Sequence, residues 1–282
     1  MNRKKFLLSA ALLVVTLWLA GCATTPYEGE GKTRSDALLQ KQFESAQKLD
    51  QTKPDGRLIF AGFALHSQSK AFRNDVLTTE KAVLTIDPGA IVFKLSNPAP
   101  GQEADWPYAT FENIDLVLKK VGALARPQDK VIVLISTHGN VDFLSINFSN
   151  TYYPHINANM LNQSLAALRG TPTLILISAC YSGSFVEPLS AASRVILTAS
   201  AKDRGSFGCQ FHSTNTHFVD ALLNQPSLSD RSIAQLMEQA KIDVDRRETK
   251  QKLSPSSLPQ IFVGSAVKEW ANQPLKNWLN SR

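Results

Sequence analysis

The sequence lacks the signatures of several common enzyme classes. It contains no Gly-x-Ser-x-Gly segment, so a serine hydrolase elbow is unsupported. It contains no Gly-x-Gly-x-x-Gly or P-loop segment, so nucleotide binding is also unsupported and no cofactor is expected. Internal repeats and low-complexity tracts are absent as well. The 282 residues are 43% hydrophobic and 19% charged, which suffices for one sizeable core.

The excess of positive charge is small. The formal net charge of +6 includes Arg3, Lys4 and Lys5, which lie in a segment that we expect to be removed. Without them, 27 of the 30 basic residues remain against 24 acidic ones, a surplus of 3. The sequence also has no basic stripe with interleaved aromatic residues, so nucleic acid is not an expected partner.

The N-terminus has the pattern of a targeting signal. Three basic residues precede the apolar segment 6–19, which is shorter than the about 20 residues that a membrane-spanning helix needs. The segment ends Leu19-Ala20-Gly21-Cys22, which resembles a bacterial lipobox. The resemblance implies that Cys22 is acylated and becomes the first residue of the mature chain. The alternative is an ordinary signal peptide with an incidental cysteine.

The lipobox resemblance also implies a location. Ala23 follows the cysteine, where an aspartate would suggest retention at the inner membrane. We therefore expect a bacterial cell-envelope protein on the periplasmic face of the outer membrane, held there by lipid. No other stretch is apolar for long enough to span a membrane.

Three parts of the chain follow from these patterns. Residues 1–21 are expected to be the signal peptide, residues 22–56 a tether or a removable prosegment, and residues 57–282 the globular domain. Within the second part, residues 35–49 could form a helix with Leu39, Phe43 and Ala46 on one stripe.

Two apolar runs organise the globular domain. Residues 131–139 and 173–180 read as strands without alternation, which is typical of strands buried on both faces of a parallel sheet. Between them, residues 159–168 have the apolar spacing of a helix. A strand–helix–strand crossover makes the two strands parallel, with their carboxyl ends at the edge where α/β sheets place their sites.

The rest of the domain alternates between expected strands and helices, which predicts an α/β fold, a three-layer α/β/α sandwich around a mostly parallel sheet. Further strands are expected at 58–65, 91–95, 194–199 and 260–263, and helices at 72–83, 111–121, 216–223, 232 to about 245, and 267–279.

The residues that end the two runs suggest nucleophilic catalysis. A thiolate at Cys180 would be the nucleophile, and His138 could accept and supply its proton. The backbone N–H groups of Gly139 and Cys180 could bind an oxyanion. Taken singly, each motif has a simpler interpretation: Cys180 as a packed core thiol and His138-Gly139 as a turn.

The two motifs resemble those of known enzymes. An apolar run ending His138-Gly139, followed by another ending Ala179-Cys180, is similar to the caspase-like cysteine peptidases of clan CD. The segments 178–185, 197–209 and 216–222 resemble the bacterial branch of the legumain family, peptidase family C13. The resemblance implies a caspase-like fold, a His138–Cys180 dyad, an acyl-enzyme intermediate, and a peptide or protein substrate extended beside the strand that ends near Ser200.

The same resemblance leads to expectations about the substrate pocket. Ser178 stands where plant and animal legumains have an acidic residue two positions before the nucleophile, and His212 stands near a second such position. Arg73 is the counterpart of their pocket arginine. Because the two acidic residues are missing, we expect a small or polar residue at the cleavage site in place of strict asparagine preference.

Other interpretations of the remaining motifs stay open. Cys209, His212 and His217 could suggest zinc, but Cys209-x-x-His212 has no second matched pair, and no metal is expected. Cys209 could pack in the interior or form a disulfide with Cys180. The pair Asp203–Arg204 could support its loop or contact substrate.

Two functions from different classes remain. The first is a lipid-anchored cysteine endopeptidase, or a transamidase if the acyl group passes to an amine. The second is a non-catalytic envelope lipoprotein that keeps the caspase-like fold to bind a partner.

Overall fold

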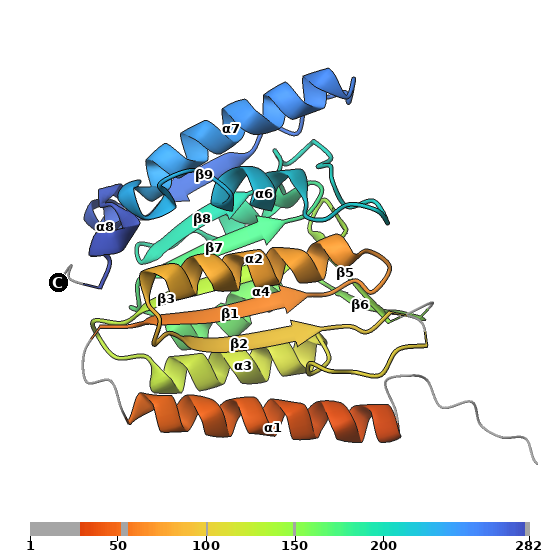
Figure 1. Cartoon of the computed structure of the whole chain (residues 1–282), viewed down its shortest axis with the longest axis vertical. Coiled ribbons are helices and arrows are strands. Elements are labelled where there is room, and N and C mark those ends of the chain that lie inside the picture. The colour runs from red at the N-terminus through yellow and green to blue at the C-terminus, as the bar shows by residue number, and fades with distance from the viewer. Residues whose placement is uncertain (1–28, 52–55, 100, 149–150, 280–282) are drawn as a thin grey trace, which may run out of the picture.

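A six-stranded sheet forms the centre of the molecule (Figure 1). The computed structural model describes residues 29–51, 56–99, 101–148 and 151–279. The strand order is β2-β1-β3-β7-β8-β9, and every neighbouring pair is parallel except β8 with β9. The strands are β1 (Leu58–Ala64), β2 (Ile91–Ser96), β3 (Lys130–Ser136), β7 (Thr173–Ser178), β8 (Arg194–Thr198) and β9 (Gln260–Val263).

Helices cover both faces of this sheet, which confirms the predicted three-layer sandwich. On one face, α3 (Phe111–Leu124) and α4 (Ala158–Leu165) pack on residues such as Ile59, Phe63 and Val133. The other face carries α2 (Lys70–Ile86), α6 (His217–Leu223), α7 (Ile233–Lys250) and α8 (Lys268–Asn272). The side chains of successive strand residues point to opposite faces of the sheet, and both faces are covered by helices. The strands therefore need apolar residues at every position.

An antiparallel ribbon is the main element that the sequence analysis missed. Between β3 and α4 the chain forms β4 (Gly139–Asn140), β5 (Phe143–Phe148) and β6 (Thr151–Ile156). Leu144, Ile146 and Phe148 alternate along β5 and are buried, which is the period-two pattern of a strand. The crossover from β3 to β7 therefore contains more than the single helix predicted.

The C-terminal segment also differs from the prediction. In place of one helix over 267–279, the chain forms α8 between two short 3₁₀ turns, Ser265–Val267 and Leu275–Asn277. Pro274 is the reason, because proline disfavours helical geometry in the residue before it. Gln273 is accordingly extended, with φ −83° and ψ 148°.

The helix expected within residues 22–56 is present and longer than predicted. α1 (Glu30–Asp50) buries Leu39 and Ala46 in the core that contains α3. The carboxylate of its last residue, Asp50, forms an ion pair with the guanidinium group of the buried Arg57, with an N–O distance of 2.6 Å. Within the described residues no helix combines the length and the apolar character that a bilayer span requires.

Candidate active site

The ends of β3 and β7 bring the two predicted catalytic segments together. These strands are parallel neighbours, with Ser136 opposite Ser178 as their last pair. Beyond them, the Thr137 N–H donates to the Ser178 carbonyl oxygen at 3.1 Å. His138 and Cys180 therefore leave the same edge of the sheet, each two residues past its strand end.

Gly139 is in direct contact with the segment that carries the thiol. A β-carbon built on Gly139 would lie 2.6 Å from the Cys180 carbonyl oxygen and 3.0 Å from Cβ of Ala179. Such a separation from a backbone atom is not sterically permitted, so only glycine fits without a shift of the chain. The structure thus explains why a glycine follows His138.

The backbone N–H of Gly139 points away from the ribbon. The His138 carbonyl oxygen accepts from the Ser145 N–H at 2.9 Å, and Gly139 pairs with Leu144 in the next position. Hydrogen-bonded and non-hydrogen-bonded pairs alternate in antiparallel ladders, so Gly139 occupies a non-hydrogen-bonded position. Its N–H is therefore free of the β4–β5 ladder, as an oxyanion donor must be.

The Cys180 thiol is half-buried and held by the loop after β8. Its Sγ accepts from the Ser206 N–H at 3.2 Å and from Ser206 Oγ at 3.6 Å. The thiol itself donates to the Ser206 carbonyl oxygen at 3.4 Å. The next residue, Tyr181, has φ 56° and donates its N–H to the Arg204 carbonyl oxygen at 2.7 Å. Sequence analysis did not assign a role to Ser206, because only the fold brings it to the sulfur.

The His138 imidazole is packed among aromatic rings. The ring centroid of His66 lies 4.5 Å away and that of Phe72 lies 4.9 Å away, both nearly perpendicular to His138. Burial lowers the pKa of His138 from its ordinary value of 6.5. The imidazole is therefore neutral at neutral pH and able to accept a proton.

His66 is a second histidine at this edge, and sequence analysis missed it. It follows β1, the neighbour of β3, and is 5% exposed. Burial, and secondly the nearby His138, lower the pKa of His66 to about 4. Its Nδ1 accepts from the Gln68 N–H at 3.4 Å, which places the proton of the neutral ring on Nε2. A histidine directly after the apolar run 58–65 was the available signal.

The residues expected to bind substrate have internal partners. Ser178 is buried and its hydroxyl lies 2.8 Å from Thr216 Oγ1. Ser200 is buried and hydrogen-bonds with Ser182. Arg73 forms a bidentate ion pair with Asp105, at 2.7 and 2.6 Å, and stacks on Trp106. Substrate contacts by these three residues remain predictions.

Cys209 lies near the predicted nucleophile but is not bonded to it. Both cysteines are free thiols in the structure. Burial, and secondly the adjacent Cys180, raise the pKa of the Cys209 thiol. In the described part of the chain no three histidine, cysteine or acidic side chains form a group that could hold a metal ion. Asp203 and Arg204 form an ion pair at 3.5 Å, which is the first of the two alternatives considered, and a substrate contact by this pair stays a prediction.

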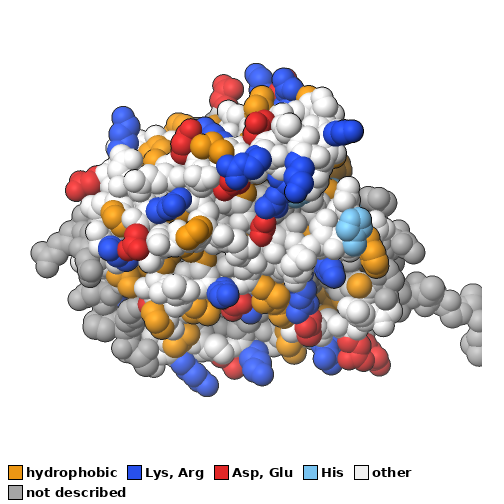
Figure 2. Space-filling view, turned by 45° about the horizontal axis from the view of Figure 1, so that its top comes forward, with side chains coloured by type: hydrophobic (Ala, Val, Ile, Leu, Met, Phe, Trp, Pro, Cys, Tyr) orange, Lys and Arg blue, Asp and Glu red, His pale blue; other side chains and the backbone are white. Residues whose placement is uncertain are grey.

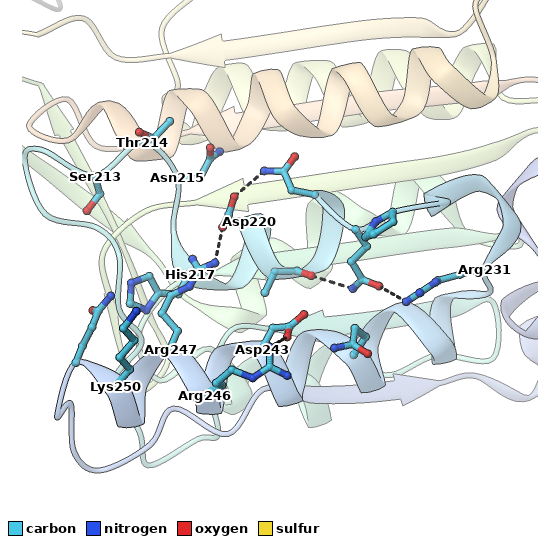
Figure 3. Close-up of a pocket in the computed structure, with 16 residues that line it drawn as sticks. Ser213, Thr214, Asn215, His217, Asp220, Arg231, Asp243, Arg246, Arg247 and Lys250 are labelled. Carbon is cyan, nitrogen blue, oxygen red and sulfur yellow. Dashed lines mark hydrogen bonds and ion pairs between the residues drawn. The ribbon is translucent and has the colours of Figure 1, made fainter.

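A separate polar groove of about 940 Å³ lies between α6 and α7 (Figure 3). Its charged side chains largely pair with one another: Arg247 with Asp220 at 2.6 Å and Arg246 with Asp243 at 2.9 Å. Basic and acidic side chains are interspersed on this side of the molecule (Figure 2). The groove contains neither His138 nor Cys180, so the candidate active site is at the strand ends and not here.

The comparisons with known proteins agree with this architecture. The sequence pattern of the peptidase C13 family matches residues 117–273, more than half of the chain. The crystal structure of caspase-1 from Spodoptera frugiperda superimposes with a TM-score of 0.50 at 17% identity, covering 75% of this chain and 87% of that one. At this identity the likeness shows the fold alone. No curated protein matches the sequence.

The chain has a caspase-like α/β/α sandwich, with a histidine and a cysteine just beyond adjacent strand ends. The family match makes it a cysteine-type peptidase. Within that class, the match over residues 117–273 shows that the chain belongs to the peptidase C13 family, the legumain family. The expected fold and the C13 family are thereby confirmed, and the bacterial branch of that family stays a prediction.

Proposed function

We propose that this peptidase is an endopeptidase that cleaves protein substrates through a dyad of His138 and Cys180. The observation that carries the proposal is the contact of Gly139 with the Cys180 backbone. It puts the imidazole-bearing segment, the thiol-bearing segment and the outward N–H of Gly139 at one point of the sheet edge. The half-buried Cys180 thiol lies in the loop that follows β7.

The proposed reaction has two stages. His138 takes the proton of the Cys180 thiol, and the thiolate attacks the carbonyl carbon of the scissile bond. The N–H groups of Gly139 and Cys180 bind the oxyanion that forms. When the intermediate collapses, the C–N bond breaks, the imidazolium protonates the leaving amine, and a thioester remains on Cys180.

Water completes the cycle. His138 removes a proton from a water molecule, the hydroxide adds to the thioester carbonyl, and the C–S bond breaks. The carboxylic acid leaves and the sulfur recovers its proton from His138. An amine in place of water would give a new amide, which is the transamidase alternative.

Cleavage of a peptide library tests the proposal. We expect cleavage by the reduced chain that begins near Thr25, read as new termini by mass spectrometry. Cys180→Ala and His138→Ala should abolish it, whereas Cys209→Ala, which removes the neighbouring thiol, should retain it. Products that carry an added amine would identify transamidation. Retention of cleavage in Cys180→Ala would contradict the dyad.

Anchoring in a bacterial envelope by a lipid on Cys22 is a further part of the proposal. The support is the Leu19-Ala20-Gly21-Cys22 sequence, which lies outside the described residues. Intact-mass analysis of the full chain purified from membranes should show a cleaved N-terminus with acyl chains on Cys22. Cys22→Ser should release the protein from the membrane fraction, and an unchanged fractionation would contradict the anchor.

A further inference from the structure

A buried carboxylate lies on the side of the sheet where α2 packs, behind the strand ends. Asp75, in the second turn of α2, is 0% exposed. Its Oδ2 accepts from Ser136 Oγ at 2.7 Å and from Thr216 Oγ1 at 2.8 Å. Its Oδ1 accepts from the Thr216 N–H at 3.0 Å and from Asn215 Nδ2 at 3.1 Å. Four donors from β3 and from the start of α6 thus converge on one carboxylate.

The network reaches β7 through Thr216. A hydroxyl has one proton to donate, and Thr216 Oγ1 gives it to Asp75. Thr216 Oγ1 therefore accepts from Ser178, whose hydroxyl oxygen lies 2.8 Å away. It also accepts the Val219 N–H at 3.3 Å, as the cap of α6. The ionised Asp75 consequently fixes the direction of the Ser178 hydrogen bond.

The two serines in this network have equivalent positions. Ser136 is the last residue of β3 and precedes His138 by two residues, and Ser178 is the last residue of β7 and precedes Cys180 by two. We propose that Asp75 is a positioning residue, whose carboxylate fixes the ends of β3 and β7 and thereby the imidazole of His138 relative to the thiol of Cys180. This inference rests on the proposed catalytic dyad.

The absence of a counter-ion supports a role beyond packing. Within the described residues, no lysine, arginine or histidine hydrogen-bonds or ion-pairs with Asp75, and all its partners are neutral donors. By contrast, the buried carboxylate of Asp129, directly before β3, is paired with Arg57 at 3.0 Å. Burying an acid without a cation is costly, so an unpaired buried acid beside an active site indicates a specific role.

The network also depends on ionisation. Burial raises the pKa of Asp75 to about 6, outweighing the hydrogen bonds from Ser136, Asn215 and Thr216 that lower it. The other titratable or charged groups on α2, β3 and α6 are Lys70, Arg73, Glu80, Lys81, Lys130, His217 and Asp220. His66, His138, Cys180 and Cys209 lie in the segments that adjoin the strand ends and the start of α6. Of these, Cys209 has a thiol pKa that Asp75 helps to raise.

Protonation would reverse one arm of the network. The Thr216 N–H and the NH₂ group of Asn215, which both face Oδ1, can only donate. A proton on the carboxyl group is therefore accommodated at Oδ2, which must then donate to the hydroxyl of Ser136 or of Thr216. Either choice exchanges donor and acceptor in the hydrogen bond between Asp75 and that hydroxyl. The hydrogen bond to Ser136 holds the end of β3, and the one to Thr216 leads to the end of β7. The dyad is therefore expected to be well aligned only while Asp75 is ionised.

Kinetics of matched variants test the inference. Asp75→Asn keeps the shape but loses the acceptor at one oxygen, and should lower kcat about 10²-fold with little change in KM, as expected for misaligned catalytic groups. The control is Asp87→Asn, because Asp87 is equally buried and accepts the Leu58 and Gly89 N–H groups at the opposite end of β1. It should leave kcat within about threefold.

Two further measurements separate positioning from folding. Thr216→Val removes the relay hydroxyl and should lower kcat, whereas Thr216→Ser keeps it and should restore the rate. The wild-type rate of thiol alkylation should fall as pH decreases through about 6, the pKa of Asp75, and Asp75→Asn should lose that step. If Asp75→Asn does not fold, the Thr216 pair decides.

The outcomes distinguish this inference from the proposed function. If the wild-type chain shows no cleavage and no activated thiol, the dyad itself is wrong. If the wild-type chain is active but folded Asp75→Asn and Thr216→Val match its kcat, the dyad stands and the positioning role of Asp75 is wrong.

Discussion

The Cys180 carbonyl oxygen lies only 2.6 Å from the point where Gly139 would carry a β-carbon. The segments that follow the adjacent strands β3 and β7 are therefore packed backbone against backbone at the centre of the candidate active site. This contact sets the distance between the segment that carries the imidazole and the segment that carries the thiol. It also leaves the Gly139 N–H on the outer side of the ribbon.

Gly139→Ala should inactivate the enzyme by forcing these segments apart. The clash is with backbone, which cannot rotate away, so we expect thiol alkylation and peptide cleavage to fall at least about 10²-fold. Gly205→Ala is the matched control, since its β-carbon would lie 3.9 Å from the Cys180 sulfur, an ordinary contact. Equal losses in the two variants would contradict the assigned role of Gly139.

His66→Phe should make the protein more resistant to acid. The pKa of His66 is lowered from 6.5 to about 4 in the folded state, so the unfolded chain binds a proton first as the pH falls. The stability that the neutral ring contributes is complete above pH 6.5 and is lost progressively between 6.5 and about 4. The loss amounts to about 3 kcal/mol.

Urea denaturation between pH 4 and 7 measures this effect. The free energy of unfolding of His66→Phe should decline less steeply with acid than that of the wild type. His212→Gln, at an exposed histidine, provides the control. Parallel curves for the wild type and His66→Phe would show that His66 is not held neutral by burial.

Asp75→Asn should have the opposite pH signature. The pKa of Asp75 is raised from 3.8 to about 6, so the folded state retains a proton that the unfolded chain releases. The wild type therefore loses stability as the pH rises from about 4 to about 6, by about 3 kcal/mol in total. The unfolding free energy of the wild type minus that of the variant should decrease over this range. A constant difference would contradict a pKa of Asp75 that burial raises.

Leu39→Ala should destabilise the whole domain if α1 is an integral part of it. Leu39 is 5% exposed in the core shared with α3, and removal of such a side chain costs about 2–3 kcal/mol. Leu49→Ala, at a residue 41% exposed on the same helix, should change the unfolding free energy by about 0.5 kcal/mol or less. Equal, small effects would favour a loosely attached α1, as expected for a removable prosegment.

The sequence predicted the sheet and the strand-end residues because those features are local. An unbroken apolar run identifies a strand buried on both faces, and the residue that follows it must lie at the sheet edge. His138, Gly139 and Cys180 could be found in this way. The ribbon β4–β6 also has a local signal, which is the alternation of Leu144, Ile146 and Phe148 along β5. The prediction of a single helix between β3 and β7 did not use this signal.

The residues that support the site depend on contacts across the chain. Ser206 reaches the Cys180 sulfur from a loop 26 positions away, and Thr216 reaches Asp75 from 141 positions away. No spacing rule encodes such contacts. The sequence does contain a signal for Asp75. This acidic residue falls on the apolar stripe of its helix, between Phe72 and Val83, where a charged side chain is unusual.

Alkylation of Cys180 tests the central claim most directly. The reduced chain would be incubated with a peptidyl electrophile, beside His138→Ala and Cys209→Ala, and adducts would be located by peptide mass mapping. The account predicts an adduct on Cys180 that forms as fast in Cys209→Ala and much more slowly in His138→Ala. A folded, reduced protein that forms no adduct on Cys180, or forms it equally fast without His138, would contradict the dyad.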